Sequence, residues 1–156
     1  MTNNLPLNGD GMGSLQFLVF ALCSLQLILL LTLQTLIDDR SAHITIVNNL
    51  ATSPLVWIST NIDSGQSVNP APKTIAPRSS GVFRVKPPSR LQGTKGSLTY
   101  RVDGFEIVIN FSCPFAKDNE ASWGGAYPSG VSLDHPTFNG NGSPLKATFS
   151  FSPVLE

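Results

Sequence analysis

A β-hairpin centred on Asp103-Gly104 constrains the fold of this chain more than any other sequence feature. This pair indicates a two-residue type I′ loop, because both positions need positive φ and Asp and Gly tolerate it. Folding about the loop pairs Val102 with Phe105, Tyr100 with Ile107 and Leu98 with Ile109 on one apolar face. On the other face it pairs Arg101 with Glu106. A slip by one residue would expose the apolar row, so we predict a hairpin over Gly96–Phe111 in this register.

The chain after Arg40 consists of short β-like runs separated by turn residues, without a helical period. Besides the hairpin, we predict strands at Ala42–Asn49, Pro54–Thr60, Val82–Lys86, Val131–Leu133 and Leu145–Phe151. Asn61–Pro72 and Ala116–Gly130 are polar and are predicted to be loops. The sequence therefore predicts one all-β domain, an antiparallel β-sandwich of seven to eight strands over residues 41–156. Its predicted core contains Leu98, Tyr100, Ile107, Ile109, Phe149 and Phe151.

The N-terminal part of the chain differs from the rest in composition. Residues 1–16 contain Gly, Pro and Asn with little to bury, so we predict a disordered tail. Residues 17–37 carry no charge and are rich in Leu, and a run of this length is enough to cross a hydrocarbon core of ~30 Å as a helix. We therefore predict that one N-terminal transmembrane helix precedes the sandwich, with the boundary at Asp38–Ser41.

The apolar run has three alternative interpretations: a signal peptide, a surface-lying helix and a core helix. A signal peptide lacks its basic N-terminal region here, and Asp38-Asp39-Arg40 stands where small residues should mark cleavage. A surface-lying helix is disfavoured because the polar residues do not gather on one face, and a core helix has no matching surface on a small β domain. We expect a retained single-pass membrane anchor of undetermined orientation, whereas a cleaved segment would make the protein secreted.

The charged residues are distributed unevenly, although ten basic and ten acidic side chains cancel overall. No acidic residue lies between Asp63 and Asp103, and that interval contains Lys73, Arg78, Arg84, Lys86, Arg90, Lys95 and Arg101. This basic stripe is typical either of a solvated face or of a surface attracted to anionic headgroups. No nucleic-acid-binding motif accompanies it, so we expect no nucleic-acid partner.

The residues that catalysis needs do not occur in suitable patterns. The chain has two histidines, His43 at the start of a strand and His135 in an Asp-His-Pro sequence that indicates a turn. It has no Cys/His zinc spacing, Gly-rich phosphate loop or paired-carboxylate motif. Cys23 lies in the apolar run and Cys113 in the folded part, which excludes an intradomain disulfide. We therefore expect no enzyme activity, no cofactor and no metal site.

The order of short motifs gives a resemblance to a known family. These motifs are Ile44-Thr-Ile-Val-Asn-Asn49, Thr74-Ile-Ala-Pro77 with Phe83 and Val85, Gly93-Thr-x-Gly96, and Cys113-Pro-Phe115 followed by Trp123. Over Ser41–Phe151 the chain resembles the aegerolysin family. It is similar also to actinoporin-type pore-formers, where Ser112 and Pro114 match positions that contact the phosphocholine headgroup. Both resemblances imply a lipid-binding β-sandwich, and pore formation is the activity they imply beyond binding.

We predict a membrane-lipid-binding module that carries an N-terminal anchor and binds with one end of the sandwich. Its predicted site contains Ser112, Pro114, Phe115, Trp123 and Tyr127, with help from Arg84 and Lys86. The two loop aromatics, Trp123 and Tyr127, either cover the open end of the sandwich or contact the ligand. The predicted partners are sphingolipid or anionic headgroups, with an oligomer or a partner protein for pore formation. The alternative is a membrane-tethered adhesion or scaffold domain that binds protein or glycan.

Overall fold

The structure is a computed structural model that describes residues 26, 39–89, 91–141 and 143–154. The chain divides between Ile37 and Asp38, and the unit Asp38–Glu156 contains all of the strands described below. The predicted tail and, apart from Gln26, the predicted transmembrane segment lie outside the described residues. Within the part of the chain that is described, no helix combines the length and hydrophobicity that a membrane span requires.

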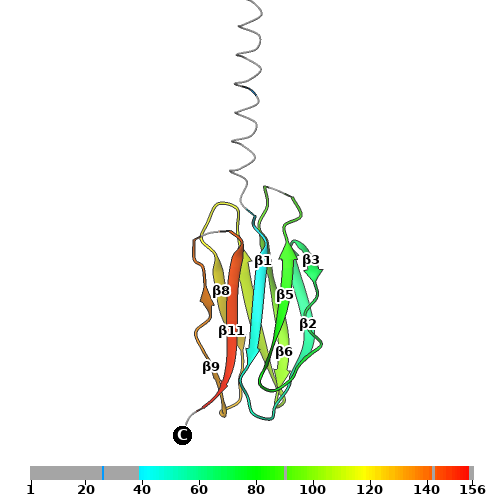
Figure 1. Cartoon of the computed structure of the whole chain (residues 1–156), viewed down its shortest axis with the longest axis vertical. Helices are drawn as coiled ribbons and strands as arrows, with labels where there is room; N and C mark the ends of the chain where they lie inside the picture. The colour runs from blue at the N-terminus through cyan, green and yellow to red at the C-terminus, as the bar shows by residue number, and fades with distance from the viewer. Residues whose placement is uncertain (1–25, 27–38, 90, 142, 155–156) are drawn as a thin grey trace, which may run out of the picture. The chain divides into compact units, whose positions relative to one another are not determined.

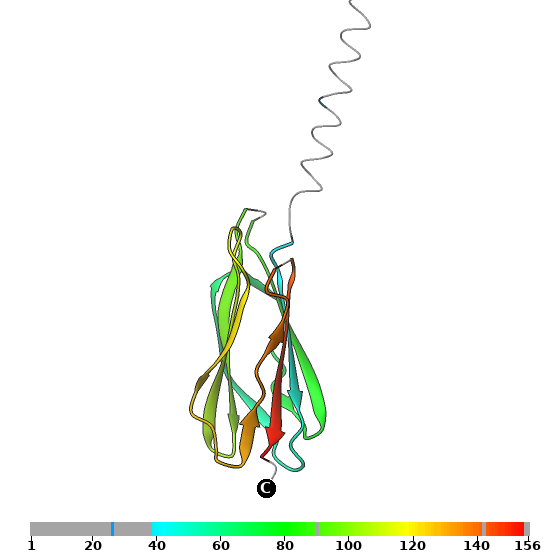
Figure 2. The ribbon, with the colours of Figure 1, turned by 90° about the vertical axis from the view of Figure 1, so that its left-hand side faces the viewer.

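In the described part of the chain, eleven strands form two facing sheets, which Figures 1 and 2 show as two layers. Sheet A has the order β10 (Thr137–Phe138), β11 (Leu145–Pro153), β1 (Ala42–Asn48), β5 (Ser79–Lys86) and β3 (Gln66–Asn69), and β9 (Val131–Leu133) also pairs with β11. Sheet B has the order β4 (Thr74–Ile75), β2 (Leu55–Ser64), β6 (Thr94–Val102), β7 (Phe105–Cys113) and β8 (Glu120–Gly125). The predicted all-β sandwich is confirmed.

The core lies between the two sheets, because alternate residues of each strand point inward. All six predicted core residues, Leu98, Tyr100, Ile107, Ile109, Phe149 and Phe151, are fully buried. Tyr100 is a large aromatic residue with a polar end, and its hydroxyl donates a 2.9 Å hydrogen bond to the carbonyl of Pro72. Burial raises the pKa of this phenol, so the hydroxyl stays protonated and can donate.

The central hairpin has the predicted turn and register. Asp103 and Gly104 have φ of 48° and 86°, as the type I′ loop requires. The predicted pairs from Val102 with Phe105 to Leu98 with Ile109 are all present between β6 and β7. On the outer face Arg101 donates to Glu106 over 2.6 Å. Only Phe105 departs from the predicted apolar face, because it lies beyond the end of the core and is 43% exposed.

Two segments predicted to be loops contain strands. β2 continues to Ser64 and β3 follows within Asn61–Pro72, while β8 occupies the middle of Ala116–Gly130. The side chains of β3 are all exposed, and β8 pairs with β7 along one side only. Polar sequence forms strands here because the backbone hydrogen bonds come from the neighbouring strand, and an exposed edge strand needs no apolar alternation.

The sheet topology also corrects two predictions. β1 and β11 pair in parallel, so sheet A is mixed rather than wholly antiparallel. The sandwich has eleven strands rather than seven to eight, because β3, β4 and β10 are short pieces at its edges and β8 is an edge strand. A strand of two residues has no alternation to read, so such pieces could not be predicted from periodicity.

A buried amide organises the connections at the end of β1. Asn48 is fully buried, and its amide nitrogen donates to the carbonyl groups of Ser53, Ile75 and Ala76 over 2.9, 3.1 and 3.2 Å. Its side-chain oxygen accepts from the backbone N–H of Leu50 over 3.1 Å. One side chain thus joins two segments that are far apart in sequence.

We expect the substitution Asn48→Ala to lower the free energy of unfolding by about 2–4 kcal/mol, because it leaves buried polar backbone groups without their partner. Asn49→Ala is the matched control: its side chain makes an exposed hydrogen bond to Ser152, so the change should stay within about 0.5 kcal/mol. Urea unfolding of the full-length protein in a mild detergent measures both. Equal losses in the two variants would contradict the role given to Asn48.

Candidate functional site

The two ends of the sandwich differ in what they present to solvent. We call the end at which β1 begins the proximal end and the end that holds the Asp103-Gly104 turn the distal end. The proximal end comprises Asp39–Ser41 and the β5–β6, β7–β8 and β10–β11 loops, because β1, β6, β8 and β11 begin there and β5 and β7 end there. Figures 1 and 2 show these loops together at the upper end of the sandwich.

Hydrogen bonds hold the proximal loops together. The contacts are Leu145 N–H to Ser41 O (2.9 Å), Thr94 Oγ1 to Arg40 O (3.0 Å), Asn119 N–H to Gly140 O (2.8 Å) and Asn119 Nδ2 to Asn139 O (2.8 Å). At Gly93 the β5–β6 loop lies in close contact with the β7–β8 loop. A Cβ at this position would lie 2.2 Å from the carbonyl oxygen of Cys113, so only glycine fits there. The two residues before β1, Arg40 and Ser41, are therefore hydrogen-bonded to the loops that surround them.

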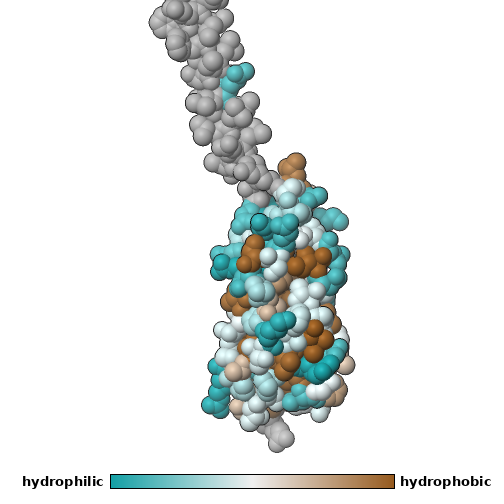
Figure 3. All heavy atoms as spheres, turned by 90° about the vertical axis from the view of Figure 1, so that its right-hand side faces the viewer, coloured by the Kyte–Doolittle hydropathy of each residue, from teal (hydrophilic) through white to brown (hydrophobic). Residues whose placement is uncertain are grey.

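Two large apolar side chains are exposed at this end. Leu91 in the β5–β6 loop is 71% exposed, and Phe115 in the β7–β8 loop is 44% exposed. Phe115 lines a shallow depression of about 270 Å³ with Arg40, Lys117 and Asn141. Figure 3 shows hydrophobic atoms at the tip of the proximal end, while other hydrophobic groups are scattered over that face. Sequence reasoning missed Leu91, whose one signal was an apolar residue in a Pro- and Ser-rich loop.

Ser112 and Pro114 lie near Phe115 but face different surroundings. Pro114 is half-buried against Gly93. Ser112 points outward from sheet B into a depression of about 210 Å³, which is also lined by Asp63, Lys95, Ser97, Asn110, Glu120 and Ser122. Ser112 therefore belongs to a surface rich in hydroxyl and amide groups rather than to the loops themselves.

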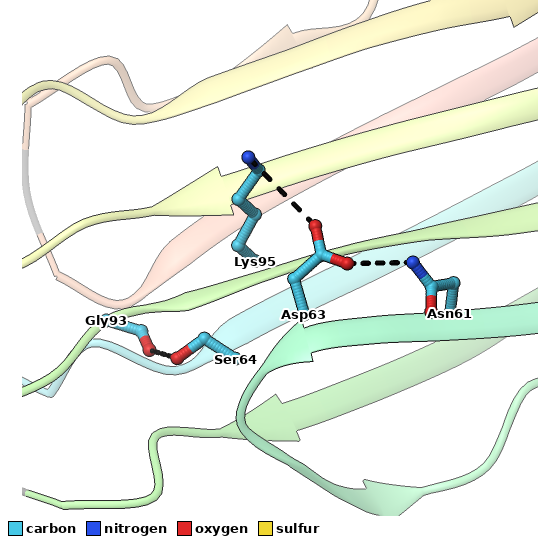
Figure 4. Close-up of polar contacts among 5 residues, drawn as sticks. All are labelled: Asn61, Asp63, Ser64, Gly93 and Lys95. Atoms are coloured by element: carbon cyan, nitrogen blue, oxygen red, sulfur yellow. Dashed lines mark hydrogen bonds and ion pairs between the residues drawn. The ribbon is translucent and has the colours of Figure 1, made fainter.

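Figure 4 shows the proximal edge of this polar surface. Lys95 forms an ion pair with Asp63 at 4.0 Å, and the other oxygen of Asp63 accepts a 2.7 Å hydrogen bond from the side-chain amide of Asn61. The Ser64 hydroxyl donates to the carbonyl of Gly93 over 2.7 Å. The charge of Lys95 is thus compensated within sheet B.

Trp123 packs against the sandwich rather than projecting from a loop. It lies in β8, and its ring meets Phe149 and Phe151 edge-on at centroid distances of 4.8 and 5.1 Å. Its Nε1–H donates to the carbonyl of Asp134 over 2.7 Å. The prediction of a flexible loop at Trp123 is wrong, because Trp123 lies in a strand beside Ile109 and its ring packs on the core.

Tyr127 lies at the opposite end from Phe115. β8 pairs Glu120 with Ser112 at the proximal side and Gly125 with Ile107 towards the distal side, which moves the chain by roughly 17 Å. Tyr127 follows this strand and is 57% exposed at the distal end. The prediction that the five loop and strand residues share one end of the sandwich is therefore wrong for Tyr127.

Arg84 and Lys86 lie on the outer face of sheet A, as the alternation of β5 predicts. Arg84 lines a broad depression of about 600 Å³ with His43 and Lys146. The pKa of His43 is lowered from its ordinary value, chiefly because the ring is partly buried and secondly because Arg84 is close. Asp39 raises it and Lys146 lowers it further. The imidazole is therefore neutral at physiological pH.

The remaining reactive groups have local structural partners. His43 Nε2 lies 3.3 Å from the Ser41 hydroxyl, and His135 Nδ1 lies 3.2 Å from the carbonyl of Pro136. Burial raises the pKa of the Cys113 thiol, which makes it a poor nucleophile. Across the described ranges, no three His, Cys, Asp or Glu side chains are grouped so that they could hold a metal ion.

The architecture of two facing sheets with loops gathered at each end is shared with proteins of known structure. The fold is that of aegerolysin-like β-sandwich proteins, so the resemblance predicted from the sequence is confirmed at the level of the fold. No protein-family model matches the sequence, and no curated protein matches it significantly.

Three solved structures illustrate the similarity. The lipid-binding protein Nakanori has a TM-score of 0.60 and 13% identity, covering 78% of this chain and 75% of its own. RahU, in complex with a Tris molecule, has a TM-score of 0.58 and 12% identity, covering 75% and 97%. IP-1A from Alcaligenes faecalis has a TM-score of 0.53 and 15% identity, covering 76% and 94%. At these identities the comparison describes the fold.

We expect Trp123→Ala to lower the free energy of unfolding by about 2–4 kcal/mol, because it removes an aromatic side chain packed on two core rings. Tyr127→Ala, at an exposed loop position, should change it by less than about 0.5 kcal/mol. Thermal unfolding followed by circular dichroism compares the two. Similar stability of both variants would show that Trp123 contributes little to the sandwich.

Proposed function

We propose that this protein is a non-catalytic, membrane-lipid-binding module that meets the bilayer with its proximal end. The observation that carries the proposal is the exposure of Leu91 and Phe115 on two neighbouring loops of that end. Arg40 and Lys117 lie beside Phe115 in the same depression. Apolar side chains next to cationic ones suit the boundary between acyl chains and headgroups.

The connection to the N-terminal segment is short. The apolar run ends at Ile37 and β1 begins at Ala42, so the extended chain between them spans at most roughly 18 Å. We propose that the apolar run is a single membrane span that keeps the protein at a membrane. The start of β1 would then stay within that distance of the end of the span.

The magnitudes explain why an anchor is useful. Burying a large apolar side chain stabilises by about 1.5–3 kcal/mol, and a basic residue near an anionic surface adds about 1 kcal/mol. Leu91 and Phe115 together therefore give only weak, reversible binding, of the order that corresponds to a millimolar Kd. A tether at the same end raises their effective concentration at the membrane and makes weak contacts sufficient.

The comparison with solved structures supports a binding role of this kind. Nakanori, which is described as a lipid-binding protein, has the same fold over most of this chain. The predicted headgroup residues Ser112 and Pro114 lie at or near the proximal end, and their role in lipid binding stays a prediction. Trp123 is left out of the proposed contact because its ring packs on the core, and Tyr127 because it lies at the distal end.

A pair of matched variants tests the orientation. Phe115→Trp and Phe105→Trp replace two phenylalanines of nearly equal exposure, 44% and 43%, at the proximal and distal ends. Each full-length variant is reconstituted in vesicles whose lipids carry bromine near the headgroup, and tryptophan quenching is compared with the parent protein. We expect extra quenching for Phe115→Trp alone. Equal quenching of both, or of neither, would refute contact between the proximal end and the bilayer.

The alternative function rests on the polar depression of sheet B. Hydroxyl, amide and charged groups from β2, β6, β7 and β8 line it, and such groups suit hydrogen bonding to a glycan. In this adhesion role the sandwich would use its face rather than its proximal end. A glycan array probed with the full-length protein, together with Ser112→Ala and the control Ser152→Ala, separates this function from lipid binding.

Two finer predictions have separate tests. Pore formation, with an oligomer or a partner protein, is a further proposal, and dye release from vesicles of sphingolipid or anionic composition measures it. Retention of the apolar segment is tested by N-terminal sequencing of the mature protein. A mature chain that begins after residue 37 would show that the segment is a signal peptide and that the protein is secreted.

A further inference from the structure

Several basic residues of this protein lie on the outer face of sheet A. The strands of sheet A contain no acidic residue, yet they contain Arg84, Lys86 and Lys146. Three other basic side chains have partners: Lys95 pairs with Asp63, Arg101 pairs with Glu106, and the Lys73 ammonium lies 3.2 Å above the ring centre of Trp57. Among the described residues, no carboxylate lies within ion-pair distance of the three cations of sheet A.

The strand register places two of these cations on either side of a histidine. His43 on β1 is directly opposite Arg84 on β5 and directly beside Lys146 on β11. Neighbouring strands lie about 4.8 Å apart, and residues in register point to the same face. All three line the depression of about 600 Å³ on the outer face of sheet A, together with the hydroxyl groups of Thr45, Thr137 and Thr148.

This arrangement carries an electrostatic cost that an anion would remove. Arg84 and Lys146 lie on the two strands that flank β1, so their like charges repel each other across the His43 ring at a strand separation of about 10 Å. Burial lowers the pKa of His43, Arg84 and Lys146 lower it further, and Asp39, which precedes β1, opposes them. An anion in the depression would offset the repulsion between the cations and favour protonation of the imidazole.

We propose that the outer face of sheet A is a binding site for a phosphate group, formed by Arg84, Lys146 and His43. The Arg84 guanidinium matches two phosphate oxygens, and Lys146 supplies a second charge. The threonine hydroxyls can donate to the remaining oxygens. This site goes beyond the proposed membrane contact of the loops and does not depend on it.

Two kinds of phosphate-bearing ligand can reach the site. His43 and Lys146 are the second residues of β1 and β11, so the site begins within about 7 Å of the proximal end. A phospholipid headgroup can reach it if that end faces a bilayer, and a soluble phosphate or phosphate ester can enter it from solvent. The shared chemistry is a tetrahedral oxyanion with at least one negative charge.

The two histidines of the chain provide an internal comparison for the test. The full-length protein in neutral detergent micelles is titrated over pH by NMR, and the imidazole signals of His43 and His135 are followed with and without inorganic phosphate. Sodium chloride keeps the ionic strength equal. We expect phosphate to raise the pKa of His43 and to leave that of His135 unchanged. An equal shift of both, or the same shift in chloride alone, would overturn the proposal.

Matched charge variants locate the binding. Arg84→Gln and Lys146→Gln should each weaken phosphate binding by about tenfold, the loss typical of one charge-assisted hydrogen bond. Lys95→Gln and Arg101→Gln remove basic residues that pair within sheet B, so they should change the affinity for phosphate by less than about twofold. Equal weakening of phosphate binding by all four variants would mean that the loss comes from the lower net charge of the protein and that the site does not exist.

Reconstitution distinguishes the two sources. In lipid nanodiscs, phosphatidic acid at fixed ionic strength should shift the His43 signal relative to phosphatidylcholine if the headgroup is the ligand. A response to inorganic phosphate without one to phosphatidic acid identifies a soluble ligand, and absence of both overturns the site. The quenching of Phe115→Trp is measured separately, so failure of the proposed membrane contact and failure of the phosphate site give different results.

Discussion

The parallel pairing of the first and last long strands is the interaction on which the remaining features depend. β1 and β11 are in register from Ala42 with Leu145 to Asn48 with Phe151, and backbone bonds from Leu145 to Ser41 and from Asn49 to Phe151 extend the pairing at both ends. Joining residues so far apart in sequence has an entropic cost, which the burial of alternate side chains from both strands offsets. The same pairing sets His43 beside Lys146.

The two sheets divide the surface chemistry between them. Sheet B carries both signs of charge, and its Lys95 and Arg101 are compensated by carboxylates, whereas the strands of sheet A carry basic residues alone. The loops add a third surface, because those at the proximal end expose Leu91 and Phe115. A protein held at a membrane by this end would present its apolar loops and the edge of its basic face together.

The sequence predictions are correct where the interactions join residues that lie close together in the chain. The hairpin was predictable because its turn residues, apolar alternation and Arg101–Glu106 pair all lie close together in the chain and agree. β3 and β8 were predicted as loops because their stability comes from hydrogen bonds to a neighbouring strand. For the same reason, the basic stripe could not be divided into paired and unpaired residues before the positions of Asp63 and Glu106 were known.

The sequence by itself determined the β class, the central register, the alternation that buries Phe83 and Val85 and exposes Arg84 and Lys86, and the six core residues. These features depend on local periodicity and turn chemistry, which a single chain shows directly. Only the tertiary structure decided the position of the aromatics: β8 packs the Trp123 ring against Phe149 and carries Tyr127 away from Phe115. Which residues meet at one end depends on strand pairing between distant segments, and local sequence does not encode that pairing.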